Sequence, residues 1–260
     1  MFETARQTSG RRVLLILASS SPRRVELLTA AGFQFRVVPP GIDERAPRPL
    51  SPLGVARWAA SAKAEAVATR FPAAVVIGAD TVVALEGRTY GKPQSPAQGR
   101  AVLRALSGRT HLVYTAVTVI DGRRHRARHG FSRTSVTMCE LSPSAIRAYV
   151  HRGEAQDKAG AYAIQGEGQR LVAAVRGPYD NVVGMPMRLV ERLLQECGIT
   201  IPAKNSDEGQ QDANDHRTRT PRDAHRRPGR ASARHAARGL RTGREFAADD
   251  HPEHRRRQRS

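Results

Sequence analysis

The longest uninterrupted apolar run in the sequence, Val13–Ala18, places the first limit on the fold. Six apolar residues are far fewer than the roughly 20 that a membrane-spanning helix needs. A run without polar alternation is typical of a strand that is covered on both faces. A second run, Ala73–Ala79, has the same character, and we expect that strand to end at Gly78-Ala79-Asp80. The two runs predict a sheet with helices on both sides, and no membrane partner.

Four Ser-Pro pairs mark the starts of helices. Serine is a favoured N-cap residue, and proline fits the first helical position because its missing N–H is not needed there. The pairs stand at Ser21, Ser51, Ser95 and Ser142. The apolar patterns that follow predict helices at about 22–31, 53–70, 95–106 and 143–152, with a last one inside 180–196.

The segments 111–120 and 125–138 alternate apolar and polar residues around Asp121-Gly122. Asp-Gly between two alternating strands is a strong signal for a β-hairpin. Further extended segments are expected at 33–38, 81–85 and 171–175. Strands that alternate with helices, plus one hairpin, predict an α/β fold with a mixed sheet.

The chain carries 43 Lys and Arg against 24 Asp and Glu, a formal net charge of +19, which favours polyanionic partners. About a third of the excess lies in residues 204–260, with 15 basic and 9 acidic residues. Only Leu240 and Phe246 there are large and apolar, too few to offset the entropy cost of ordering. We therefore expect a flexible N-terminus at 1–12, a folded domain at 13–203 and a basic, disordered tail at 204–260.

The cysteine and histidine content also excludes some classes of site. Cys139 and Cys197 lie far apart and form no CxxC pair, which is typical of a reducing compartment, so a cytoplasmic location is expected. No histidine in the predicted domain belongs to an HExxH or similar pair, which argues against a metal site built on Cys or His.

The segment Ser19–Arg24 is a candidate anion site. A strand runs into a serine-rich turn and then into a helix whose first turn carries two arginines. Free N–H groups and the helix dipole attract anions there, and guanidinium groups match phosphate oxygens. The competing interpretation is a well-capped surface helix with solvated arginines, since no P-loop pattern occurs in the sequence.

Other candidates are weaker when each is taken alone. Asp80 follows an apolar strand and could hold a metal or act as a general base, or could simply form a turn. Lys92 stands between Gly and Pro on a stiff loop, and Asp43-Glu44 offers two more carboxylates. In the small-residue stretch 157–166, Gln165 offers a donor and an acceptor for a base edge. Together they suggest metal-assisted chemistry on a nucleoside polyphosphate, because hard cations bridge carboxylates and phosphates.

In this order, the segments resemble the motifs of the Maf family of septum formation inhibitor-like nucleotide pyrophosphatases. The matching stretches are LILASSSPRRVELL, GIDE, AKAEAVA, VIGADTVVALEG, GKP, LSGRTH, DKAGAYAIQG and NVVGMP. They run from Leu15 to about Pro186, nearly all of the predicted domain. The residues of the DKAGAYAIQG stretch resemble the motif of the family branch that acts on dTTP and UTP, rather than that of the branch that prefers 7-methyl-GTP.

The resemblance implies hydrolysis of nucleoside triphosphates to the monophosphate and pyrophosphate with Mg²⁺ or Mn²⁺. It implies an elongated mixed sheet flanked by helices, with two lobes and a central cleft, similar to inosine triphosphate pyrophosphatase and often dimeric. The biological roles that it implies are removal of unwanted nucleotides and arrest of cell division.

The resemblance also assigns roles to residues. Asp80 is implied as the proton acceptor that activates water. The positions that match those setting base preference are Arg23, Thr81 and Gln165. Those that match phosphate or substrate contacts are Ser19, Ser21, Arg24, Lys63 and Lys92. Those that match metal ligands are Asp43, Glu44 and Asp80. Asp43 and Glu44 are alternatives, because both are acidic.

A different class of function has to be weighed as well. The arginine clusters at 217–244 and 255–259 suggest a nucleic-acid-binding factor that acts through its tail. Against this, the tail holds one aromatic residue to stack on bases, and acidic residues interrupt it. A tail of this composition also arises when a GC-rich gene is translated past its natural stop.

Overall fold

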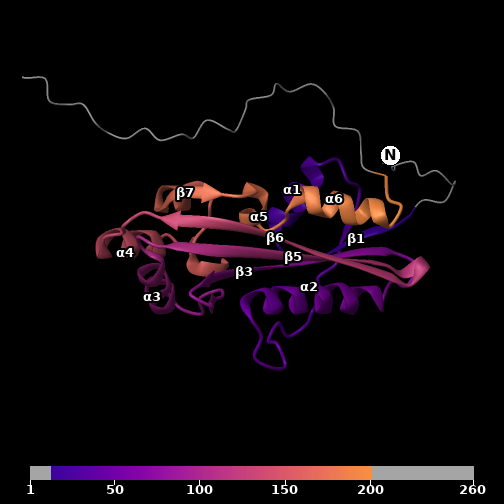
Figure 1. Cartoon of the computed structure of the whole chain (residues 1–260), viewed down its shortest axis with the longest axis horizontal. Coiled ribbons are helices and arrows are strands. Elements are labelled where there is room, and N and C mark those ends of the chain that lie inside the picture. Colours follow the sequence, from indigo (N-terminus) through magenta and orange to yellow (C-terminus); the bar gives the residue numbers. More distant parts are fainter. Residues whose placement is uncertain (1–12, 201–260) are drawn as a thin grey trace, which may run out of the picture. The chain divides into compact units, whose positions relative to one another are not determined.

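The computed structural model describes residues 13–200, which form one mixed sheet with helices on both faces (Figure 1). The strands lie in the order β2-β1-β3-β5-β6-β7, with β4 paired to β3. Their bounds are β1 Leu15–Ala18, β2 Arg36–Val37, β3 Val75–Leu85, β4 Arg88–Tyr90, β5 Thr110–Asp121, β6 Arg126–Met138 and β7 Val172–Arg176. The helices are α1 Pro22–Ala30, α2 Pro52–Ala68, α3 Pro96–Leu106, α4 Pro143–His151, α5 Tyr179–Val183 and α6 Met187–Glu196.

The mixed α/β class predicted from the sequence is confirmed, because β1 is parallel to β2 and β3 while the remaining pairs are antiparallel. Within the described part of the chain, no helix is both long and apolar enough to cross a membrane. The predicted N-terminal segment 1–12 and tail 204–260 lie outside the described residues, as do 201–203.

All four Ser-Pro pairs start helices, as predicted, but they do not all cap in the same way. Ser51, Ser95 and Ser142 each accept a hydrogen bond from the backbone N–H three residues later. The side chain of Ser21 makes no such bond at the start of α1. The first turn of α1 is therefore the one among these four whose N-cap hydroxyl is left for another partner.

The strand that was expected to end at Gly78-Ala79-Asp80 does not end there, and that prediction is wrong. β3 continues to Leu85 because β5 pairs with it without a break from Val75 to Ala84. On the opposite edge, β1 pairs only as far as Gly78 and β4 begins only at Val83. No strand of the described chain pairs with 79–82 on that edge, so Asp80 lies within a strand beside an open gap.

Three other boundaries also differ from the sequence-based prediction. The hairpin turn is four residues long, since Asp121 pairs with Arg126 and the Asp121 side chain accepts the N–H of Arg123. The strand expected at 33–38 is only two residues long. The last helical region is divided into α5 and α6 because Gly184 takes a φ of 116° and Pro186 follows. Strand β4 had no predicted counterpart.

The side chains of β3 alternate between the two faces of the sheet. On one face, Val76 packs in a cluster with Ala64 and Val67 of α2. On the other face, Ile77 belongs to a core with Leu28 of α1 and residues of α6, such as Val190. α1 and α6 thus lie across the sheet from α2 (Figure 1).

A second core begins further along β3. Val83 packs there with Leu103 of α3 and with Ile146 and Tyr149 of α4. The two cores therefore occupy opposite ends of one strand, in agreement with the two lobes that were expected. Asp80 and Thr81 lie between them.

Gly78 sets the distance between β3 and α2. A Cβ atom at this position would lie 2.3 Å from the carbonyl oxygen of Ala60 and 2.7 Å from the backbone nitrogen of Ala64. We expect Gly78→Ala to lower the free energy of unfolding by about 3 kcal/mol, because helix backbone has to move away. Urea titration measures this. Gly91→Ala is the matched control, since its Cβ meets nothing within 4 Å, and should stay within about 0.5 kcal/mol.

His111 is 1% exposed and bonds through Nε2 to the Tyr162 hydroxyl at 2.7 Å, while its Nδ1 has no partner among residues 13–200. Burial lowers the pKa of His111 from 6.5 to about 4. Between these pH values the unfolded chain binds a proton that the folded chain does not, so stability is lost as the pH falls.

This shift corresponds to about 3 kcal/mol between pH 7 and pH 4. We expect the fall in unfolding free energy over that range to be smaller by this amount in His111→Asn than in the parent chain. The exposed His151→Asn variant is the control for loss of an imidazole. Equal pH profiles for His111→Asn and the parent chain would contradict the assignment.

Candidate active site

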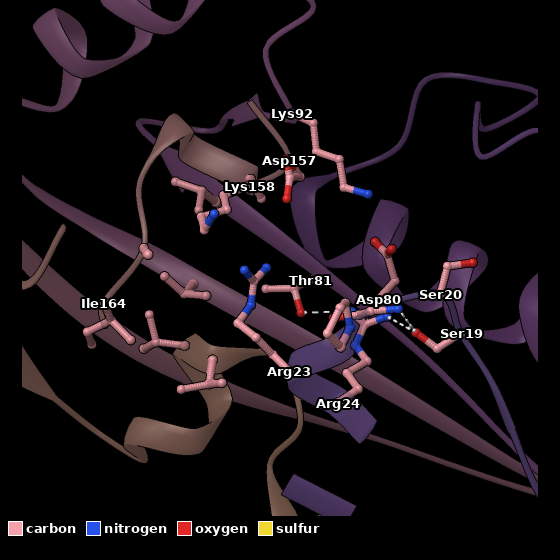
Figure 2. Close-up of a pocket in the computed structure, with 18 of the residues that line it drawn as sticks. Ser19, Ser20, Arg23, Arg24, Asp80, Thr81, Lys92, Asp157, Lys158 and Ile164 are labelled. Atoms are coloured by element: carbon pink, nitrogen blue, oxygen red, sulfur yellow. Dashed lines mark hydrogen bonds between the residues drawn. The ribbon is translucent and has the colours of Figure 1, made fainter. Parts of the chain in front are cut away.

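A pocket opens at the gap in the edge of β3, and Figure 2 shows its lining. Segments far apart in the sequence meet here: the turn from β1 into α1, one residue of α2, the middle of β3, the loop at Lys92, the stretch 157–165 and α5. All but one of the sequence-predicted site residues line it, namely Ser19, Ser21, Arg23, Arg24, Glu44, Lys63, Asp80, Thr81, Lys92 and Gln165.

Lys63 of α2 holds two carboxylates together. Its Nζ donates to Asp80 Oδ1 at 2.7 Å and lies 2.9 Å from Glu44 Oε2. Lys63 is only 5% exposed, and a buried ammonium group needs such partners because burial removes its hydration. Lys63, predicted from the sequence to contact phosphate, therefore pairs with two carboxylates of the protein itself.

Asp43 is the one predicted residue that lies outside the pocket. Its carboxylate pairs with Arg45 at 2.9 Å, and both side chains are largely exposed. Hydrogen bonds from Arg45 lower the pKa of Asp43. Of the two acidic alternatives, Glu44 lines the pocket and Asp43 does not.

Arg24 lies against the open edge of β3. Its Nη1 donates to the carbonyl oxygen of Ala79 at 2.8 Å, its Nε to that of Gly184 at 2.9 Å and its Nη2 to Thr81 Oγ1 at 3.2 Å. A longer bond of 3.5 Å reaches Ser19 Oγ (Figure 2). Burial lowers the pKa of this guanidinium. Arg24 therefore supplies the hydrogen-bond donor that a neighbouring strand would give to Ala79. It also joins β3 to the residue that follows α5.

The start of α1 faces the same pocket. Ser19 Oγ accepts from the backbone N–H of Ser21 at 3.1 Å, and Pro22 has no N–H. The backbone N–H groups of Arg23 and Arg24 have no acceptor among the described residues. These two N–H groups and the Ser21 hydroxyl, which makes no capping bond, are donors that can bind an anion at the N-terminus of α1.

Cationic side chains border this end, one of them from α1 itself. Arg23 and Lys92 line the pocket without an ion pair in the described part of the chain, and Lys158 lies beside Asp157 on the opposite wall (Figure 2). Asp157 and Lys158 were not predicted as site residues. Their signal was their position at the start of the small-residue stretch that carries Gln165.

The other end of the pocket is apolar. Val83 of β3, Val113 of β5 and Val182 of α5 line it, together with Tyr162 and Ile164. Gln165 is exposed at its rim, and its side chain does not cap the turn that follows. One cavity thus joins a charged end with carboxylates, cations and free N–H groups to an apolar end with an amide.

The carboxylates also fit a hard divalent cation. Among residues 13–200 no cluster of three or more His, Cys, Asp and Glu side chains forms a complete ligand cage. Glu44 and Asp80 are joined through Lys63, and each has a second oxygen that takes no hydrogen bond within the described chain. One or two carboxylates, with substrate phosphates and water completing the shell, is the ligand set that Mg²⁺ prefers.

The chain is similar in sequence to known proteins. Residues 14–197 match the family model described as Maf-like protein. The chain is 50% identical over 187 residues to the dTTP/UTP pyrophosphatase of Moorella thermoacetica, covering 72% of this chain and 96% of that protein. It is 45% identical to the enzyme of the same name from Deinococcus radiodurans, covering 72% and 94%. A HAM1 protein from Coxiella burnetii is 13% identical, covers 71% and 99%, and has a TM-score of 0.43.

The neighbouring arginines of α1 offer a paired test. Arg24→Lys removes the planar group that reaches four acceptors, so we expect the free energy of unfolding to fall by about 3 kcal/mol. Arg23→Lys keeps the charge of a side chain that makes no such contacts within the described residues, and its free energy of unfolding should stay within about 0.5 kcal/mol of the parent chain. Urea titration of both variants measures the difference. Equal stabilities would show that Arg24 does not hold the strand edge.

Proposed function

The chain belongs to the Maf family, and on this premise we propose that it hydrolyses dTTP and UTP to the monophosphate and pyrophosphate. The observation that carries the proposal is the pocket itself. It combines paired carboxylates, an open helix N-terminus and free cations at one end with an apolar, amide-bearing end of the kind that a base needs.

The triphosphate binds at the charged end. The free N–H groups at the start of α1 and the Ser21 hydroxyl donate to phosphate oxygens, and Arg23 and Lys92 supply positive charge. Hydrolysis between the α and β phosphates builds negative charge on the departing pyrophosphate. Fixed cations stabilise this charge most strongly where water is excluded.

Asp80 accepts the proton of the attacking water. Lys63 holds Oδ1 of Asp80, which leaves Oδ2 as the oxygen that can take up the proton. As the water oxygen bonds to phosphorus and its proton passes to Asp80, the bond between the α and β phosphates breaks and pyrophosphate leaves. Lys63 and Glu44 stay paired through the reaction and keep the carboxylate of Asp80 in place.

Glu44 and Asp80 would hold the divalent cation, Mg²⁺ or Mn²⁺, that such enzymes use. When bound, the cation supplies Lewis acidity and neutralises phosphate charge. The role of Lys63 in this arrangement is to keep the two carboxylates close to each other before the cation and the substrate arrive.

The base lies at the apolar end. Val83, Val113 and Val182 cover its ring, Thr81 and Gln165 offer hydrogen-bonding groups to its polar edge, and Arg23 lies between base and phosphates. The proposal therefore keeps the roles in base preference that the sequence resemblance assigns to Arg23, Thr81 and Gln165.

Two further features of the family are proposed for this chain. The first is a homodimer, which light scattering behind a sizing column would test. The second is action in the reducing cytoplasm, where it would remove unwanted nucleotides; the free thiols of Cys139 and Cys197 support this location. The alternative of nucleic-acid binding depends on residues 204–260, which lie outside the described residues, and the comparisons lend it no support.

The direct test is a pyrophosphate-release screen over dTTP, UTP, CTP, 7-methyl-GTP and ITP with Mg²⁺ or Mn²⁺. We expect turnover of dTTP and UTP. Asp80→Asn should lower kcat by ~10²–10⁴, the usual contribution of a general base. Asp43→Asn is the matched control, because that carboxylate lies outside the pocket, and should keep turnover.

No turnover of any of the nucleotides would contradict the proposed function. Full turnover by folded Asp80→Asn would contradict only the role of Asp80. Circular dichroism and thermal melting of each variant separate loss of catalysis from loss of the fold.

A further inference from the structure

A chain of hydrogen bonds runs behind the apolar end of the pocket. Thr81 of β3 lines the pocket and stands opposite Thr115 of β5 in the sheet register. Their hydroxyl oxygens are 3.0 Å apart. Thr115 is fully buried, and its Oγ1 lies 2.8 Å from the backbone carbonyl oxygen of Asn181 in α5.

The direction of each bond follows from counting protons. A carbonyl oxygen only accepts, so the single hydroxyl proton of Thr115 goes to Asn181, since two acceptors 2.8 Å apart would repel each other. Thr115 must then accept the proton of Thr81. The guanidinium of Arg24 only donates, so Thr81 accepts from it at 3.2 Å. The hydroxyl proton of Thr81 therefore points to Thr115 and away from the pocket. One lone pair of Thr81 Oγ1 then remains to accept a hydrogen bond from a ligand.

The far end of this chain is held in place. Asn181 is fully buried, and its Nδ2 donates to the carbonyl oxygen of Val113 at 3.1 Å and to Thr134 Oγ1 at 2.9 Å. The backbone carbonyl of Asn181 cannot reorient without breaking these two hydrogen bonds and disrupting helix α5, to which it belongs. The polarity of the chain is thus set by backbone and does not depend on the ligand.

We infer that Thr115 is a positioning residue that holds Thr81 as a pure hydrogen-bond acceptor toward the base. This inference rests on the proposed function. Uracil and thymine carry a ring N–H donor at N3, whereas cytosine carries an acceptor there. An acceptor facing an acceptor inside an apolar pocket has no water to compensate it, so the mismatched base is rejected.

The test compares kcat/KM for UTP and CTP, measured by pyrophosphate release. In Thr115→Val the Thr81 proton loses its acceptor and can turn into the pocket, so the preference for UTP over CTP should fall about tenfold. Thr115→Ser keeps the hydroxyl and should restore the preference. A merely structural role of Thr115 would lower the two rates together and leave their ratio unchanged.

Thr118→Val is the matched control on the same strand. Thr118 is 2% exposed and bonds to Ser61 and His129, not to a residue that lines the pocket. It loses a buried hydroxyl as Thr115→Val does, and its UTP to CTP ratio should match that of the parent chain.

A second measurement needs no variant. We expect the parent chain to turn over 3-methyl-UTP at least about tenfold more slowly than 5-methyl-UTP, since only the latter keeps the N3–H group. Equal rates for these two probes, no preference for UTP over CTP, or an unchanged ratio in Thr115→Val would each overturn the inference. Failure of the parent chain to hydrolyse UTP and dTTP would instead overturn the proposed function.

Discussion

The contact between the Arg24 guanidinium and the open edge of β3 is the interaction on which the rest of the site depends. A gap between β1 and β4 leaves the carbonyl oxygen of Ala79 without a strand neighbour, and a buried carbonyl without a donor is costly. Arg24 supplies that donor from α1. The gap can therefore persist as a pocket instead of closing with another strand.

The same guanidinium ties the pocket together across long sequence separations. It reaches Gly184 after α5 and Thr81 on β3, so one side chain joins the end of α5 to the strand. Burial lowers its pKa, and the cost of burying the charge is offset by bonds to several acceptors. The predicted contact of Arg24 with phosphate stays a prediction beside this structural role.

Strand β3 separates two kinds of chemistry by its alternation. Asp80 points to the α2 face, where the close approach of Gly78 to Ala60 brings Lys63 within 2.7 Å of its carboxylate. Thr81 points to the other face, where Arg24 and Thr115 hold its hydroxyl. Neighbouring residues of one strand thus line the pocket while each bonds to a different set of partners.

Much of the fold was predictable because its signals are local. Serine caps, prolines at helix starts and apolar runs act over a few residues, and the helices begin where these signals stand. The continuation of β3 past Gly78 was not predictable, because it depends on pairing with β5 some 40 residues further along the chain. The choice of Glu44 over Asp43 likewise depends on Lys63, which approaches from a separate helix.

The sequence by itself determined which parts this protein has: the buried strands, the capped helices and the polar side chains in the order of the family's motifs. Only the tertiary structure decided which of those side chains already have partners. Lys63 bonds to a carboxylate 17 positions away, and Arg24 to a carbonyl 160 positions away. Such pairings remove a group from solvent and fix the direction in which it donates its hydrogen bonds. They depend on the folded arrangement because no local pattern encodes the distant partner.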